Sequence, residues 1–137
     1  MEETLEALAL QRGKLCRQLA ELGDFRRGMI SVNYRKCGRK NCVCAQPAHR
    51  GHGPQYLWNS TMGGRSVAKN LKLGPELEKV QAEVANYQRF TALSRQLIEV
   101  NGKICRLRPV REMEDEGELE ELKKKLRRQF SRKSARR

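Results

Sequence analysis

The chain has 137 residues, of which 38% are hydrophobic and 33% charged, and its formal net charge is +13. This small apolar fraction favours one small domain with extended helices over a large compact globule. The charge predicts a polyanionic partner, with nucleic acid ahead of an anionic membrane. No segment approaches the ~20 apolar residues of a membrane span, and the acidic start at Met1–Glu3 is not a secretory signal. We therefore expect a cytoplasmic protein with no membrane partner, whose five cysteines are reduced or metal-bound.

The positive charge is concentrated in the middle of the chain. Residues 25–75 contain ten Lys and Arg side chains and no Asp or Glu. Because a solvated surface normally mixes both signs, this carboxylate-free stretch predicts a surface that faces an anion.

The first predicted element is a helix over residues 1–22. Its leucines follow the 3–4 spacing of a heptad seam, and Gly23 is a suitable C-cap. Thr4 gives no clear N-cap, which leaves the start open by a few residues. Cys16 lies beside the seam and is predicted to be at least half-buried. The seam leucines are Leu5, Leu8, Leu15, Leu19 and Leu22.

Alternating apolar and polar residues then predict three strands, over residues 28–36, 55–61 and 65–73. The Gly63-Gly64 pair suits a tight hairpin between the second and third strands. We expect a three-stranded antiparallel meander, interrupted by a Cys/His loop between the first two strands.

A long helix is predicted over residues 75–109. Pro75 suits its first position, and Pro109 ends it. Its apolar residues form two seams, offset between Tyr87 and Phe90 as in a coiled coil that has skipped a residue. It would be about 50 Å long against about 30 Å for the first helix. We expect it to pack antiparallel on that helix as a helical hairpin stalk, and its excess apolar surface predicts a homodimer or a protein partner. Cys105 is predicted to pack beside its seam.

The tail is predicted to hold a short amphipathic helix, followed by a disordered basic arm over residues 131–137. The fold class is therefore α+β. The predicted parts are an N-terminal stalk helix, a basic β/zinc head, a long return helix and a charged tail, over residues 1–24, 25–74, 75–109 and 110–137.

Three of the five cysteines and both histidines fall in the loop of the head. Thiolate and imidazole are the ligands that zinc prefers, and four ligands complete a structural site. We predict a single Zn²⁺. His52 is preferred as the fourth ligand because glycines flank it on both sides, and His49 is the alternative. The C-x4-C-x-C spacing is less stereotyped than C-x2-C, which leaves an iron–sulfur cluster or free thiols as alternatives. The predicted ligands are Cys37, Cys42, Cys44 and His52.

Basic and aromatic residues around this loop form the predicted nucleic-acid surface. The cations would neutralise phosphates in a salt-sensitive manner, and the aromatic side chains would either stack on unpaired bases or pack on the sheet. The surface comprises Arg26, Arg27, Tyr34, Arg35, Lys36, Arg39, Lys40, Arg50, Trp58, Arg65 and Lys69.

No catalytic site is predicted. The only aspartates, Asp24 and Asp115, lie far apart in the sequence and outside the basic stretch. A two-metal nuclease needs several converging carboxylates, and no phosphate-binding loop or nucleophile elbow occurs. A Cys-His pair is conceivable for Cys42 and His52, but three thiols so close together are typical of metal ligands.

In the predicted strands, the Cys/His loop and the long helix, the chain resembles an uncharacterised family of short bacterial and archaeal proteins. This family is a domain of unknown function whose members are often labelled transposase-related. The resemblance covers roughly residues 24–107 and implies His52 as the histidine of a His-Gly-Pro element. It implies no established activity. It rests on Gly28, Ile30, Ser31, Cys37, Gly38, Cys42, Cys44, His52, Gly53, Pro54, Tyr56, Trp58, Gly64, Arg65, Val84, Tyr87 and Arg89.

The sequence therefore predicts a non-catalytic, zinc-containing protein that binds DNA or RNA, as an accessory or subunit of a mobile-element or other nucleoprotein complex. The alternative is an adaptor that docks on a protein partner through its helical stalk.

Overall fold

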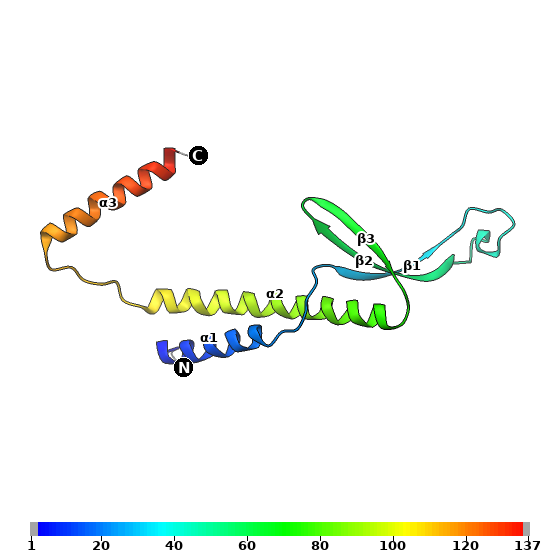
Figure 1. Cartoon of the computed structure of the whole chain (residues 1–137), viewed down its shortest axis with the longest axis horizontal. Helices are drawn as coiled ribbons and strands as arrows, with labels where there is room; N and C mark the ends of the chain where they lie inside the picture. The colour runs from blue at the N-terminus through cyan, green and yellow to red at the C-terminus, as the bar shows by residue number, and fades with distance from the viewer. Residues whose placement is uncertain (1–2, 136–137) are drawn as a thin grey trace. The chain divides into compact units, whose positions relative to one another are not determined.

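A computed structural model describes residues 3–135 of the chain. It confirms the α+β fold, with an N-terminal helix, a three-stranded sheet interrupted by the Cys/His loop, and long C-terminal helices (Figure 1). Residues Met1–Cys105 form one compact unit and Arg106–Arg137 a second. The elements are α1 (Leu5–Ala20), β1 (Met29–Arg35), the 3-10 turn η1 (Val43–Ala45), β2 (His52–Met62), β3 (Arg65–Leu71), α2 (Pro75–Leu107) and α3 (Glu116–Ala135).

The stalk pairs α1 with the C-terminal half of α2 in antiparallel orientation. Lys103 Nζ lies 2.9 Å from Glu3 Oε1 at one end, and Asn86 Nδ2 donates to the Asp24 carbonyl at 2.9 Å at the other. The start of α1 is fixed by Thr4, whose hydroxyl accepts a hydrogen bond from the Ala7 N–H at 3.1 Å. Thr4 is thus an N-cap that the sequence pattern had not revealed. The buried stalk core consists of Leu8, Leu15, Leu93, Val100 and Ile104.

The sheet is an antiparallel meander in the order β1-β2-β3. Ile30 pairs with Trp58, which pairs in turn with Lys69, so these three side chains share one face of the sheet. Gly63 and Gly64 form the predicted hairpin turn. Strand β2 starts at His52, earlier than predicted, because its first residues already pair with the end of β1.

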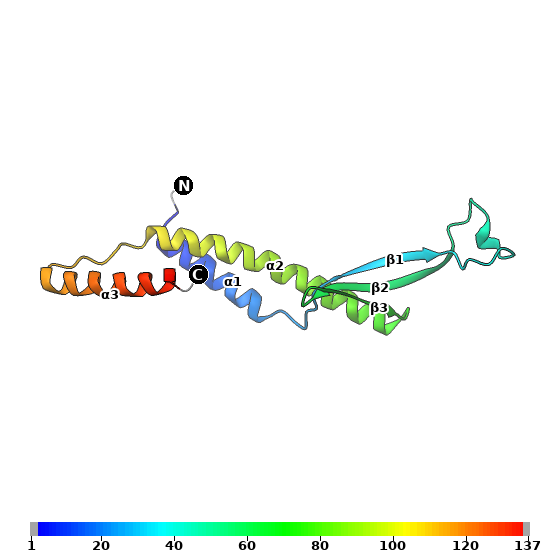
Figure 2. The same cartoon turned by 90° about the horizontal axis from the view of Figure 1, so that it is seen from above.

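A second apolar core lies between this face of the sheet and the N-terminal half of α2, and Figures 1 and 2 both show the sheet beside that half. The sheet therefore covers apolar surface of α2 that α1 does not reach, and a homodimer or a protein partner on the long helices stays a prediction. Because one helix serves both cores, its apolar seams must point in two directions. The core consists of Trp58, Leu71, Val80 and Val84, with Ile30, Tyr56 and Leu77 packed against it.

Aromatic residues mark the point where α2 changes partner. Phe25, in the connection from α1 to β1, stacks on Phe90 with ring centroids 4.8 Å apart and planes 9° apart. Tyr87 completes the cluster at 6.3 Å from each ring. The offset between the two predicted seams is therefore the switch from the sheet to α1, and these three rings fill it.

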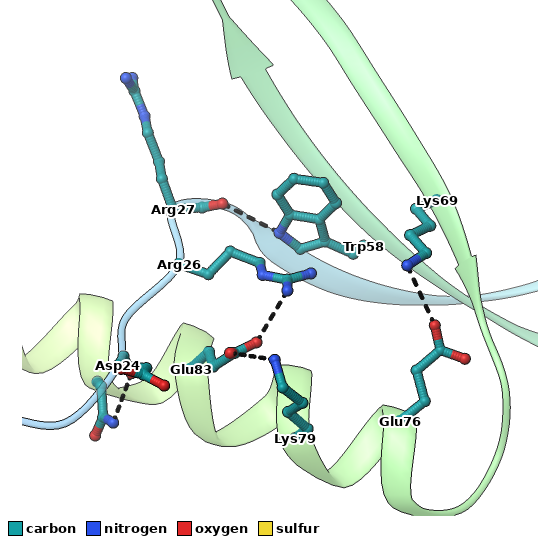
Figure 3. A network of polar contacts seen from close by, with 9 residues as sticks. Asp24, Arg26, Arg27, Trp58, Lys69, Glu76, Lys79 and Glu83 are labelled. Carbon is teal, nitrogen blue, oxygen red and sulfur yellow. Dashed lines mark hydrogen bonds and ion pairs between the residues drawn. The ribbon is translucent and has the colours of Figure 1, made fainter.

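A network of polar contacts joins this connection to α2 and the sheet (Figure 3). Arg26 and Lys79 both pair with Glu83, at 3.1 and 2.6 Å, and the Arg26 guanidinium lies 5.0 Å above the Trp58 ring. The Trp58 indole N–H donates to the Arg27 carbonyl at 3.1 Å. The hydrogen bond from Lys79, together with the charge of Arg26, lowers the pKa of Glu83 despite its burial. The Glu83 carboxylate is thus held by two cations where the sheet meets α2.

The second unit contains α3, whose N-terminus is capped by Asp115. The Asp115 carboxylate accepts hydrogen bonds from the N–H groups of Gly117 and Glu118, at 2.8 and 3.3 Å. The helix continues to Ala135, so residues 131–135 are helical and not a disordered arm as predicted. The remainder of that predicted arm, residues 136–137, lies outside the described residues.

Two further expectations concern cysteines and membranes. Cys16 and Cys105 are exposed, so the prediction that they pack beside the stalk seam was wrong. None of the helices within residues 3–135 combines the length and apolar character needed to cross a membrane.

Candidate metal centre

Four metal-ligating side chains converge where β1 ends and β2 begins. Cys37 follows the last residue of β1 by two positions, and His52 is the first residue of β2, paired with Arg35. Cys42 precedes η1, and Cys44 lies within it. The sheet register therefore fixes two of the ligands, while a single 3-10 turn presents the other two.

Glycines on either side of His52 allow this close approach. Gly51 has a φ of 105°, and a Cβ there would lie 2.7 Å from the carbonyl carbon of Arg35. Gly53 has a φ of 146°, and its Cβ would meet the Asn33 carbonyl oxygen at 2.8 Å. Any other residue at either position would push the histidine away from β1.

The ligand atoms lie close enough together to surround one metal ion. The Sγ atoms of Cys37 and Cys44 are 3.4 Å apart, Cys42 Sγ is 3.3 Å from His52 Nε2, and all four atoms lie within 4.8 Å of one another. A metal held by thiolates at about 2.3 Å places neighbouring sulfurs about 3.8 Å apart. Cys37, Cys42, Cys44 and His52 could therefore hold a metal ion.

His52, and not His49, completes the group of four side chains that could hold a metal ion. The Nδ1 atom of His49 accepts a hydrogen bond from the Gly51 N–H at 3.0 Å, and its ring lies 6.5 Å from that of His52. His49 thus holds the turn that leads into the ligand. The preference for the histidine with two flanking glycines, and the resemblance that implied it, agree with the structure.

The pKa values of Cys37 and Cys44 are shifted in opposite directions. Hydrogen bonding from the Arg39 backbone, with support from His52 and Cys44, lowers the pKa of Cys37 to about 6. For Cys44, the hydrogen bond from the Cys37 backbone lowers the pKa, but burial and the neighbouring thiols outweigh it and the net shift is upward. Cys44 is only 1% exposed and is the interior ligand of the loop.

Residues 35–50, which we call the basic lobe, surround these ligands with exposed cations. Lys36 Nζ donates to the Gln46 carbonyl at 3.2 Å, and the Arg50 guanidinium carbon lies 4.4 Å from the centre of the Tyr34 ring. The lobe contains no carboxylate. In both Figures 1 and 2 the loop lies at the end of the sheet away from α1. The five exposed cations are Arg35, Lys36, Arg39, Lys40 and Arg50.

Three other residues of the predicted surface are engaged within the fold. Trp58 is 8% exposed and belongs to the core beneath the sheet, so its ring cannot stack on a base. Arg26 is paired with Glu83, and Lys69 lies 3.4 Å from Glu76 on α2. The stacking role predicted for Trp58 was wrong because the strand alternation could not reveal which face α2 covers. Contacts of the half-buried Arg26 and the exposed Lys69 with phosphates stay predictions.

Two arginines of that surface remain exposed outside the basic lobe. The side chain of Arg27 points away from α2 (Figure 3), although its carbonyl binds Trp58. Arg65 is exposed at the hairpin turn, at the other end of β2 from the ligands. The structure thus brings together the metal ligands and the five cations of the lobe, but not these two.

The contact between Tyr34 and Arg50 was missed from the sequence. The register of β1 and β2 shifts between Asn33 and Arg35, so Tyr34 occupies an irregularity where strand alternation no longer tells which residues are neighbours. The glycines at Gly51 and Gly53 were the one available signal of an irregular approach.

A family model described as "Domain of unknown function (DUF6788)" matches residues 5–82. This range contains α1, the whole sheet with its metal ligands, and the start of α2. No curated protein and no solved structure matches the chain. Since the matched range is more than half of its length, the chain belongs to this family of domains of unknown function.

Proposed function

We propose that the chain is a non-catalytic nucleic-acid-binding protein whose basic lobe is ordered by Zn²⁺ and contacts phosphates. One observation carries the proposal: four metal-ligating groups converge within a segment that presents five exposed cations and no carboxylate. Ligands and cations alternate along the same short segment. An ion that fixes the ligands therefore also fixes the spacing of the positive charges.

Zinc is the metal that suits the donor set best. Three thiolates and one imidazole form a common closed structural zinc site, with all four positions supplied by protein. Such a site leaves no open position for a reacting water or substrate. Its role in the proposal is to order the lobe, which has too few apolar residues to order itself.

The carboxylates of the chain support the non-catalytic part of the proposal. Glu76 and Glu83 are engaged with cations, and Asp115 caps α3. Within the described residues these acidic groups have structural contacts outside the lobe, and none belongs to the cluster of metal-ligating groups.

Reversing two charges of the lobe tests the contact with phosphates. In the double variant Arg39→Glu/Lys40→Glu, affinity for nucleic acid should fall for all sequences alike, and the slope of log K against log salt should decrease by about 1.8 on duplex DNA. The matched control is Arg89→Glu/Arg95→Glu, the same change of charge on exposed positions of α2. Titrations between 50 and 200 mM salt measure both. Equal affinities of the two double variants would exclude the lobe as the contact surface.

Purification at low salt addresses the identity of the partner. One zinc per chain, with bound nucleic acid released by salt and digested by DNase or RNase, is the expected result and identifies the polymer. Membership of a mobile-element or other nucleoprotein complex is part of the proposal, and it predicts that such an assembly copurifies. Zinc without nucleic acid would favour the adaptor that docks through its stalk. We do not favour the adaptor because the sheet covers the α2 surface that had suggested it.

A further inference from the structure

We propose that the stacked pair of Tyr34 and Arg50 is a binding site for an unpaired base of single-stranded nucleic acid. The inference rests on the proposed function and names the class of nucleic acid that the basic lobe selects. It comes from a contact that phosphate binding alone does not require.

The geometry of the pair is that of a stacking platform. The Arg50 guanidinium carbon lies 4.4 Å from the centre of the Tyr34 ring, and both side chains reach solvent, with Tyr34 37% exposed. A guanidinium that rests on an aromatic face keeps its plane oriented at low cost in entropy. The guanidinium plane offers a second, opposite face to a flat ligand.

The pair of Arg26 and Trp58 shows how an ordinary packing contact of the same kind differs from that of Arg50 and Tyr34. Arg26 lies above Trp58, but it is paired with Glu83 and the indole is buried. Arg50 has no described ion pair among residues 3–135, and its segment contains no carboxylate that could compete for it. The first pair is part of the core, whereas the second is open to a ligand.

Both residues of the pair lie beside the candidate metal centre. Tyr34 lies at the irregularity of β1, where a Cβ on Gly53 would come within 3.0 Å of its Cδ1 atom, and Arg50 lies between His49 and the ligand His52. The hydrogen bond from the Gly51 N–H to His49 fixes the turn. The platform is therefore positioned in advance of binding, which reduces the entropy lost when a base is bound.

The chemistry of the pair selects bases that are not stacked in a helix. Bases in a duplex are covered on both faces, whereas bases in single strands are free to stack on aromatic rings and guanidinium planes. Arg35 and Lys36 adjoin Tyr34 in the sequence and would contact the flanking phosphates. Ribose and deoxyribose strands share this chemistry, and the test below distinguishes them.

The test compares full-length protein and its variants on labelled single strands of DNA and of RNA, on the same strands with abasic positions, and on a duplex. Arg50→Lys keeps the charge but removes the plane, and Tyr34→Leu removes the ring. Each should weaken binding to single strands by at least about fivefold and leave binding to the abasic strands unchanged. Arg95→Lys is the matched control, because it makes the same exchange on an exposed position of α2.

Zinc content is measured for every variant. In the event that Tyr34→Leu does not fold, the result for Arg50→Lys carries the test by itself. Variants that keep the wild-type ratio of affinities between intact and abasic strands would overturn this inference, even where the Arg39→Glu/Lys40→Glu variant confirms contact with phosphates. Failure of the wild-type chain to bind any nucleic acid in a salt-dependent manner would instead overturn the proposed function, and this inference with it.

Discussion

The basic lobe and α2 achieve order in opposite ways. Two apolar cores lie along α2, one against α1 and one against the sheet, and they contain most of the buried side chains of the first unit. Between residues 36 and 51 the one buried apolar side chain is Cys44, and Val43 is 64% exposed. Burial of apolar surface stabilises the first region, whereas in the proposed function a bound metal ion stabilises the second.

This difference separates two kinds of sensitivity within one short chain. Removing a methyl group affects the cores, because close-packed side chains leave a cavity when one is truncated. In the proposed function, removing a ligand atom affects the lobe, because it removes the metal ion that orders this segment. The two regions should therefore fail independently, and each prediction below changes one region while the other is monitored.

The largest effect is expected from Cys44→Ser. This change removes the interior ligand, so zinc content should fall from one per chain to less than about a tenth, because structural zinc contributes about 10–16 kcal/mol of apparent binding free energy. Helical circular dichroism should change little, since the cores on α2 lie elsewhere. Mass spectrometry of the metal and trypsin cleavage after Arg39 and Lys40 measure the two regions.

Cys105→Ser is the matched control for that experiment, since it makes the same chemical change at an exposed position of α2. Loss of helicity in Cys44→Ser as large as the loss of zinc would show that lobe and helices form one cooperative unit, against the separation argued above.

A smaller effect is expected from truncation in the stalk core. Leu8 is 2% exposed, so Leu8→Ala should reduce the free energy of unfolding by about 2–5 kcal/mol and leave zinc content unchanged. Leu10 in the same helix is 76% exposed, and Leu10→Ala should remain within about 0.5 kcal/mol of the wild type. Urea unfolding followed by circular dichroism measures both. Similar losses in the two variants would contradict the assigned seam of α1.

The smallest effect is expected from Glu83→Gln, which weakens the network between the sheet and α2. A loss of about 1–3 kcal/mol is expected at neutral pH, because Glu83 is bound by two cations. Its lowered pKa means that this contribution is present above the ordinary carboxyl value of 4.5 and is lost as the pH falls through the folded value. The difference between variant and wild type should therefore shrink as the pH falls below the ordinary carboxyl value of 4.5.

Thermal unfolding between pH 7 and pH 3 measures this difference, with Glu78→Gln on an exposed position of α2 as the control. A gap between Glu83→Gln and wild type that is the same at pH 3 as at pH 7 would assign the loss to packing and not to charge.

The elements and the ligand set could be predicted from the sequence because each depends on local pattern. The helical seams, the alternating strands and the hairpin at Gly63-Gly64 need no knowledge of distant contacts. His52 could be preferred over His49 because its flanking glycines indicate a sharp turn. The offset between the seams of α2 was visible as well, although its cause was not.

The assignment of faces could not be predicted. Alternation placed Trp58 and Lys69 on one side of the sheet, but only the packed structure shows that α2 covers this side and that Glu76 and Glu83 meet the cations there. Contacts between residues far apart in sequence decide which charges remain exposed. The same reason explains why the pairing of the half-buried Arg26 with Glu83 was not predicted.

The distance along the sequence between residues that contact each other has a consequence for synthesis on the ribosome. Glu3 meets Lys103 across 100 residues, whereas all four metal ligands lie between Cys37 and His52. At about 5–20 residues per second, the ligand set is complete several seconds before the partner surface of α1 has been made. Under the proposed function, we therefore expect the nascent chain to order its lobe first, while α1 still lacks its partner surface on α2. Stalled chains that end within α2 should accordingly resist trypsin at Lys40 in the presence of zinc, and cleavage there regardless of zinc would refute this order.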